Sequence, residues 1–294
     1  MKRGTIKLAR EHGVPLLFLG LSLYFLAAIV LRKAAGLTRE DGVLESLTAL
    51  FYGGASLLCL RGFVISRGKA SRMLCLAWAA LFFLFAMEEI SWGQRLLELE
   101  TPAAIAALNL QNETNLHNLS SELANRVFYV FVFAVGTALP VLVPKNTRLN
   151  SVVARWRTLL PQQDLAVPVA LAFAFVSPEW MAQAPEMGLL LAVTFLGFLL
   201  ALKNSLSDKG VHFMQISAWH LWVGLTGIAA IQLSLLIFRG SIEHINQPNE
   251  VKEFLFSACF LLFSLRLAGV PWLTTGRRHH AQAGGAHPQF QVPE

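Results

Sequence analysis

The residue types best suited to chemistry gather directly after one apolar run of the chain. Glu88 and Glu89 stand side by side at the end of the run, and Arg95 follows in Glu-Glu-Ile-Ser-Trp-Gly-Gln-Arg. If the run is a helix, its carboxyl end already carries partial negative charge. Two ionised carboxylates there cost free energy unless they are paired, hydrated or bound to a cation. Arg95 can pair with one of them, which leaves the other as a candidate proton acceptor or metal ligand.

A second polar stretch follows a short apolar segment. Asn109, Glu113 and His117 are spaced four residues apart, so they would share one face of a helix. A Glu and a His one turn apart can reach the same metal ion or the same proton-transfer site. The alternative is an amphipathic helix on the membrane surface, with its polar face in water. Amides that suit hydroxyl, phosphate or hard-cation ligands accompany them: Asn109, Asn112, Asn115 and Asn118.

A third polar patch joins the last two apolar runs and contains Glu243 and His244. Acids in the first turn of a helix are stabilised by the backbone dipole, so we interpret Glu45, Glu250 and Glu253 as structural. Glu243 and His244 have no such local explanation. We expect these two residues to contact a substrate at the same site.

Composition indicates the elements that must position these residues. Of 294 residues, 55% are hydrophobic and 14% are charged, whereas soluble domains carry about 25% charged residues. The sequence therefore predicts an all-α, polytopic transmembrane helix bundle of about eight spans in a single domain, residues 1–272, with an amphipathic or re-entrant segment after the third span. Residues 273–294 are predicted to form a disordered cytoplasmic tail. The expected spans are 14–31, 43–66, 73–92, 127–144, 163–181, 187–203, 212–238 and 251–272.

The fifth of these windows differs from the rest. Its uninterrupted apolar core runs only from Leu165 to Val176 and contains Pro168. Such a length suits a kinked or re-entrant segment as well as a span. Both alternatives stay open at this point.

Charge predicts the orientation of the bundle. If the chain crosses the membrane eight times, 17 of its 24 Lys and Arg residues lie on the side of the N-terminus, and 14 of its 18 acids lie on the other side. Basic residues mark the cytoplasmic side. We therefore expect a bacterial inner-membrane protein with both termini in the cytoplasm. The net charge of +6 then reflects membrane orientation, and no nucleic-acid partner is expected.

The two polar stretches resemble a signature of a group of bacterial multi-pass membrane proteins. The resemblance rests on residues 85–95 and 109–118, with a similar opening at 40–49, and covers mainly the first 120 residues. It implies a membrane location. No activity is established for that group, so the resemblance assigns no residue a role.

A second comparison is with intramembrane CAAX-type proteases, which carry Glu-Glu-x-x-x-Arg followed by membrane-embedded His motifs. Here Glu88 and Glu89 precede Arg95 by two residues too many, and Gly93 occupies the position of the expected Arg. The family's His-x-x-x-Asn is also absent, because Ser121 stands four residues after His117. The partial similarity favours hydrolysis slightly and carries over no site residue.

We therefore expect an acidic site on the extracytoplasmic face, with Glu88, Glu89, Glu113 and His117 as catalytic candidates. The predicted chemistry is hydrolysis or group transfer on a membrane lipid or lipid-linked substrate, with a carboxylate as general base. A divalent cation held by Glu89, Glu113 and His117 would let an acidic face bind an anionic substrate. The expected substrate contacts are Arg95, Asn109, Asn112, Asn115, Asn118, Glu243 and His244.

Two other functions fit the same composition. A transporter of cations, protons or small solutes would use the acids as an outward vestibule, and it requires a polar path through the membrane. The seventh window offers Gln215, Ser217, His220, Gln232 and Ser234 for such a path. A non-catalytic assembly subunit would instead use the acidic face to dock a partner.

Overall fold

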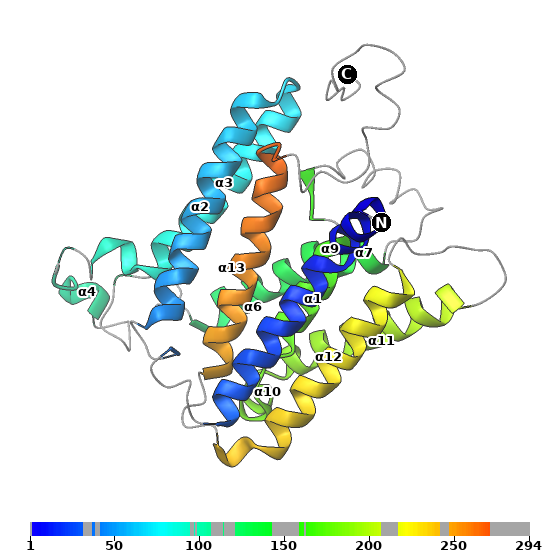
Figure 1. Cartoon of the computed structure of the whole chain (residues 1–294). Coiled ribbons are helices and arrows are strands. Elements are labelled where there is room, and N and C mark those ends of the chain that lie inside the picture. Colours follow the sequence, from blue (N-terminus) through cyan, green and yellow to red (C-terminus); the bar gives the residue numbers. More distant parts are fainter. Residues whose placement is uncertain are drawn as a thin grey trace, which may run out of the picture.

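The computed structural model is built of helices throughout the residues that it describes (Figure 1). These are residues 2–31, 37–38, 42–94, 97, 99–106, 114, 121–142, 159–161, 163–206, 217–241 and 247–270. The long helices are α1 (Lys2–Val30), α2 (Val43–Ile65), α3 (Lys69–Glu89), α11 (Pro185–Leu206), α12 (Ala218–Ile237) and α13 (Gln247–Leu267). The shorter elements are η1 (Ser91–Gly93), α4 (Ala103–Ala106), α6 (Ser121–Phe133), η2 (Ala134–Ala138), α7 (Leu139–Leu142), α9 (Gln163–Phe173), α10 (Pro178–Gln183) and η4 (Arg239–Ser241).

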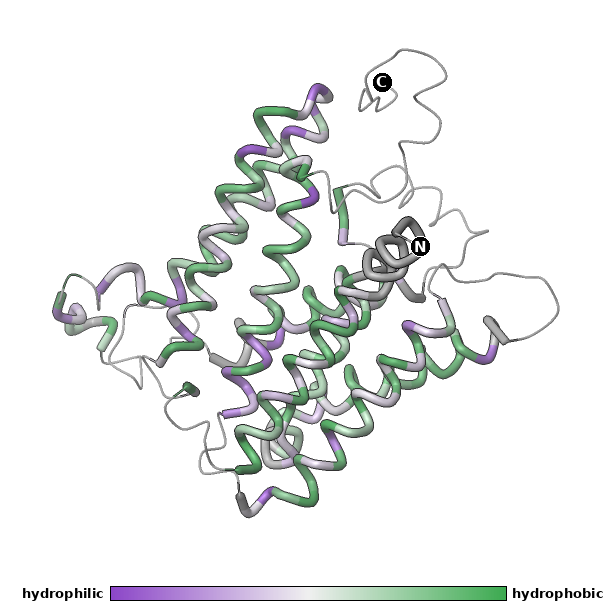
Figure 2. Tube along the Cα trace, viewed as in Figure 1, coloured by the Kyte–Doolittle hydropathy of each residue, from purple (hydrophilic) through white to green (hydrophobic). Residues whose placement is uncertain are grey.

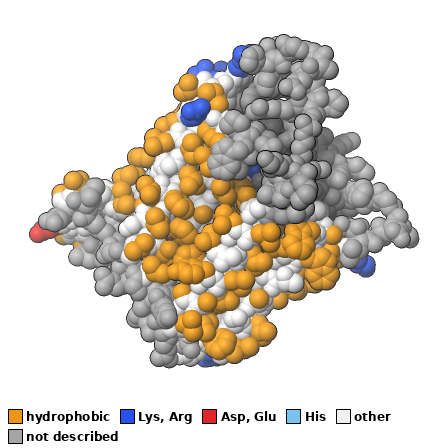
Figure 3. All heavy atoms as spheres, in the orientation of Figure 1, with side chains coloured by type: hydrophobic (Ala, Val, Ile, Leu, Met, Phe, Trp, Pro, Cys, Tyr) orange, Lys and Arg blue, Asp and Glu red, His pale blue; other side chains and the backbone are white. Residues whose placement is uncertain are grey.

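Five helices are long and apolar enough to cross a membrane. They cover Gly13–Val30, Val43–Ile65, Lys69–Glu89, Pro185–Lys203 and Ala218–Ile237. Only 33% to 44% of each apolar window is buried inside the chain, so most of its side chains face outward. Figure 3 shows this apolar covering over the visible face of the bundle. The prediction of an all-helical chain with several membrane-suited helices is confirmed.

The other three predicted windows have different structures. Residues 121–142 form a helical run that widens to a π-helix at η2. Pro140 explains the widening, because proline has no N–H and its ring displaces the carbonyl four residues earlier. The fifth window forms the short helices α9 and α10. In the eighth window α13 has 21 residues, and Glu250, Lys252, Glu253 and Arg266 interrupt its apolar surface.

Contacts between helices show the relative directions of α2, α3 and α13. In α2 and α3 the Ser56 hydroxyl donates to the Ala79 carbonyl at 2.8 Å, while the ring of Tyr52 lies 5.3 Å from that of Phe85, so the two helices are antiparallel. By contrast, α2 and α13 are parallel, because Cys59 contacts Ser264 while Arg61 contacts Ala268. We call the end of the bundle where α3 ends, and where α2, α6 and α13 begin, the acidic end. The basic end is the opposite one, where α2 ends and α3 begins.

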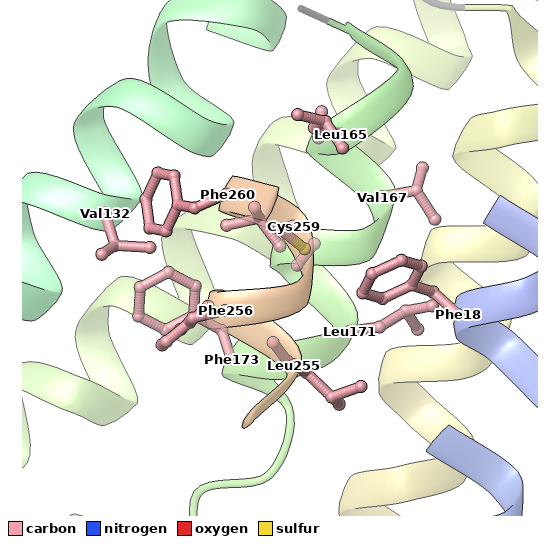
Figure 4. Close-up of a cluster of buried hydrophobic side chains, with 14 of the residues drawn as sticks. Phe18, Val132, Leu165, Val167, Leu171, Phe173, Leu255, Phe256, Cys259 and Phe260 are labelled. Atoms are coloured by element: carbon pink, nitrogen blue, oxygen red, sulfur yellow. The ribbon is translucent and has the colours of Figure 1, made fainter. Parts of the chain in front are cut away.

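The short helix α9 forms the centre of the fold. Every side chain from Leu165 to Ser177 is at most 2% exposed. Figure 4 shows α9 residues enclosed by side chains from α1, α6 and α13, with Leu171 near Phe18 and Phe173 near Phe256. The eleven residues of α9 extend only about 16 Å, roughly half of the 30 Å bilayer core. The helix is therefore too short to span by itself and is buried by its neighbours instead.

After α9 the backbone leaves the helix while still buried. The last helical hydrogen bond of this segment runs from Phe175 N–H to the Ala172 carbonyl at 3.1 Å, and residues 175–177 have no regular secondary structure before α10 begins at Pro178. The side chain of Gln232 on α12 donates to the carbonyls of Ala174 at 2.6 Å and Val176 at 3.0 Å. Irregular backbone is tolerated at membrane depth only where protein groups satisfy it. Gln232 performs that role, and the window is a broken helix.

We predict that Gln232→Leu destabilises the bundle. The substitution keeps the apolar volume but leaves two buried carbonyls without donors, each worth about 1–3 kcal/mol. A total of about 2–4 kcal/mol lowers the apparent melting temperature in detergent by roughly 5–10 °C. The matched control is Thr226→Val, because the Thr226 hydroxyl donates within its own helix to the Trp222 carbonyl. Equal melting temperatures for the two variants would contradict the role assigned to Gln232.

Candidate functional site

Of the residues predicted to form a site, Glu88 and Glu89 are described by the structure. Both belong to the last turn of α3, which ends at Glu89 rather than at residue 92. The remaining predicted residues lie outside the described parts of the chain, so their places stay predictions. They are Arg95, Asn109, Asn112, Glu113, Asn115, His117, Asn118, Glu243 and His244.

A left-handed turn stops α3 immediately after the two glutamates. Ser91, Trp92 and Gly93 have φ values of 47°, 56° and 79°. A non-glycine residue in this region is strained by about 1–3 kcal/mol, and such residues concentrate at functional sites. Two backbone bonds close the turn, from Gly93 N–H to Ile90 O at 2.9 Å and from Gln94 N–H to Ser91 O at 3.0 Å.

Thr114 connects the second polar stretch to this turn. Its hydroxyl donates to the Ser91 carbonyl at 2.8 Å, and its backbone N–H donates to Gln94 Oε1 at 2.7 Å. The two stretches singled out in the sequence therefore meet at this residue. Thr114 is a bend residue, so the continuous helix expected from Asn109 to His117 is wrong at this position. The reason is that Gln94 receives the N–H that a helix would direct to its own backbone.

The turn gives the two adjacent glutamates different surroundings. The indole N–H of Trp92 donates to Glu88 Oε1 at 2.6 Å, which explains why Trp92 lies over the helix end. Glu89 is half-buried in the last turn of the same helix, and Trp92 does not bind it.

A buried hydrogen-bonded group continues the interior site at the start of α13. The Tyr129 hydroxyl donates to Glu253 Oε1 at 2.7 Å. The ammonium group of Lys252 lies 4.0 Å from the centre of the Tyr129 ring and 3.1 Å from Asn249 Oδ1. Lys252 is completely buried, and a desolvated cation over an aromatic ring gains about 2 kcal/mol. These contacts offset part of the cost of placing a cation and a carboxylate inside the bundle.

Tyr52 completes the group from the neighbouring helix α2. Its side chain is 1% exposed, and its hydroxyl oxygen has no hydrogen-bond partner. Buried polar groups are nearly always hydrogen-bonded, so this buried phenol without a partner is an unusual feature of the described core.

We call Tyr52, Glu89, Tyr129, Lys252 and Glu253 the tyrosine–glutamate cluster. It is contributed by α2, α3, α6 and α13 at the acidic end of the bundle. Figure 2 shows hydrophilic residues at the beginning of α13, within an otherwise hydrophobic set of helices. The cluster supplies a proton acceptor, two phenolic donors and a cation. Within the described ranges no three His, Cys, Asp or Glu side chains converge on a metal site.

Sequence reasoning missed four members of this cluster. Glu253 was assigned to helix capping, and Tyr52, Tyr129 and Lys252 were not singled out. A signal did exist, because the chain has only three tyrosines and all of them, Tyr24, Tyr52 and Tyr129, stand inside predicted spans. Lys252 also stands inside the eighth window, where an unpaired cation is costly.

His220, considered for a transport path, lies at the edge of α12 rather than in its middle. The helix begins at Ala218, and Ser217 caps it by accepting from the His220 N–H. The His220 ring also contacts the Ser217 hydroxyl. His220 therefore takes part in the cap at the start of α12, which gives it a structural role.

Comparisons with known proteins add no relative for this chain. A scan against protein-family models gave no match, and neither curated proteins nor solved structures gave one.

We predict opposite stability effects for the two tyrosines of the cluster. Tyr129→Phe removes a donor to a carboxylate and leaves Glu253 short of a partner, which costs about 1.5–3 kcal/mol. Tyr52→Phe removes a hydroxyl that has no partner, so the protein keeps its stability or gains slightly. Thermal unfolding of both variants in the same detergent measures the difference. A Tyr52→Phe variant as unstable as Tyr129→Phe would show that the Tyr52 hydroxyl is satisfied.

Proposed function

We propose that this chain is an integral membrane enzyme whose acid–base site is the tyrosine–glutamate cluster. The proposed reaction is hydrolysis or group transfer on a membrane lipid or lipid-linked substrate. The observation that carries the proposal is the buried Tyr52 hydroxyl, which has no partner and belongs to a ring packed against Phe85 of α3 and Phe260 of α13. Ionisable residues at membrane depth mark functional sites by default.

The chemistry follows from the surroundings of each group. Glu89 is the proposed general base and accepts a proton from an attacking water or alcohol. Tyr52 donates a hydrogen bond to a substrate oxygen on which negative charge develops. Lys252 and Tyr129 are positioning residues, because they hold Glu253 and offset its charge.

The helix core between the cluster and the basic end supports a site that opens at the acidic end only, rather than a transport path through the membrane. Toward the basic end, the described core between α2, α3 and α13 is made of aromatic rings, with Trp78, Phe82, Phe260 and Phe263 packed 5.1 to 6.3 Å apart. The hydroxyl of Ser56 is engaged by a backbone carbonyl within the same bundle. A transport path needs polar groups there, so catalysis is favoured over transport.

The proposed setting is the cytoplasmic membrane of a bacterium, with eight crossings and both termini inside. The three predicted windows that lack a membrane-length apolar helix would then cross the membrane in other ways. These are the α6–α7 run with its π-helical turn, the interrupted α9–α10 segment, and α13, whose first turns are polar. In this orientation the acidic end is extracytoplasmic. The substrate would enter from the outer leaflet, where Trp92 lies at the helix end as an interfacial anchor.

The proposal also includes a divalent cation, two of whose ligands would come from residues outside the described ranges. Glu113 and His117 would hold it together with Glu89, and it would bridge the acidic end to an anionic headgroup. Thr114 lies against the α3 turn, which supports a place for its neighbouring residues in this region. The activity experiment below includes a chelator to test this part separately.

The experiment reconstitutes purified protein in liposomes of total bacterial lipid and follows individual lipids by mass spectrometry over time. Wild-type protein is expected to convert at least one lipid, and Glu89→Gln to slow that conversion about 100-fold or more, since a general base contributes about 10²–10⁴. Tyr52→Phe is expected to slow it while the melting temperature is kept. The matched control is Glu100→Gln, an exposed carboxylate outside the tyrosine–glutamate cluster.

Each outcome separates the parts of the proposal. Unchanged lipids with wild-type protein, or full conversion by Glu89→Gln, would overturn the enzymatic function. Lipid conversion that continues in the presence of a chelator would contradict the role of the cation and leave the rest of the proposal intact. Solute flux across the same liposomes, abolished by Glu89→Gln without lipid conversion, would indicate the transporter instead.

A further inference from the structure

We propose a second binding site at the basic end, where the α2–α3 hairpin holds the phosphate of an anionic phospholipid. The site consists of Arg61, Arg67, Lys69 and Arg72. It lies at the opposite end of the bundle from the tyrosine–glutamate cluster and does not depend on the proposed function.

Among the residues that the structure describes, no carboxylate pairs with any of these four cations. No Asp or Glu occurs between residues 46 and 87 of the sequence, which covers the hairpin and all of α3 before its final turn. All four side chains are exposed. Figure 3 shows Lys and Arg side chains gathered at this end of the visible face. Uncompensated like charges repel one another, so an anion from outside the chain would stabilise them.

Two contacts hold guanidinium groups in place. Arg61 Nε donates to the Ala268 carbonyl at 3.2 Å, just past the end of α13. The Arg72 guanidinium lies 4.5 Å from the centre of the Phe63 ring. Side chains fixed in this way lose less conformational entropy when they bind a phosphate.

The register of the helices places acyl-chain surface directly beside the cations. On α3, Lys69 and Arg72 share a face with Met73 and Leu76, which are 54% and 38% exposed. On α2, Arg61 shares a face with Leu57 and Val64, which are 69% and 74% exposed. A charged turn followed by an apolar stripe on both helices matches an amphiphile with a phosphate head and hydrocarbon tails.

This arrangement goes beyond the general excess of basic residues on one side of a membrane. That excess requires cations near the ends of spans but no common face and no fixed side chains. The combination of cations and apolar stripes also favours a lipid over a soluble polyanion, because a soluble polyanion would leave the adjoining apolar stripes uncovered.

The test measures binding of fluorescent phosphatidylglycerol to the full-length protein in detergent micelles, with phosphatidylcholine as the neutral lipid and glycerol phosphate as the soluble anion. Wild-type protein is expected to prefer phosphatidylglycerol over phosphatidylcholine by at least tenfold. Each cation near the surface contributes about fivefold, so the combined variant R67Q/K69Q/R72Q should lose about 100-fold in affinity. Lys203→Gln, an exposed lysine in the last turn of α11, should bind like wild type.

Two further measurements keep the result interpretable. The combined variant must elute and melt like wild type, and Arg67→Gln alone should give about a fivefold loss if the combined variant does not fold. Equal affinity for both lipids, or unchanged affinity in these variants, would overturn the site. Binding of glycerol phosphate as tight as that of the lipid would show that the apolar stripes contribute nothing.

Discussion

The fold depends on satisfying the backbone of one short segment at its centre. α9 is buried yet too short to cross a bilayer, and its chain continues without regular secondary structure at full burial. In a hydrocarbon environment each unsatisfied carbonyl costs several kcal/mol. The Gln232 amide meets two of them, which requires α12 to lie against α9 in one register. Gly227 permits that approach, because a Cβ there would stand 2.4 Å from Leu171 Cδ2.

The same constraint acts on the polar cluster at the acidic end. Glu253 and Lys252 are adjacent on α13 and point in different directions, so they need help from another helix to compensate both charges. Tyr129 provides it, since its hydroxyl binds the carboxylate while its ring carries the ammonium group. One side chain thus compensates both charges. Tyr52 receives no equivalent partner, and this difference between the two tyrosines is why the proposed site is centred on Tyr52.

Sequence patterns predicted the helical class and the positions of most apolar helices, because membrane spans leave a long and uniform signal. The boundaries were less accurate. α3 ends at Glu89 rather than at residue 92 because three residues adopt left-handed conformations, and no residue type except Gly93 favours that geometry. The break after α9 was left open since Pro168 and the short apolar core indicated irregularity without saying how the carbonyls would be satisfied.

The site was only partly predictable for a related reason. Two adjacent glutamates at a helix end drew attention through their local cost, and both belong to the last turn of α3. Tyr52 and Tyr129 carry no such local cost, because a tyrosine is ordinary in an apolar helix. Their importance arises from the packing of α2, α3, α6 and α13, which brings together residues far apart in sequence. Tyr129 and Glu253 are separated by 124 positions.

The broken helix also sets an order for assembly during synthesis. The carbonyls of Ala174 and Val176 receive their donors from a residue 58 and 56 positions later in the chain. Until α12 has been synthesised, the carbonyls at the end of α9 lack these donors. The centre of this protein therefore reaches its final structure only after most of the chain has been made.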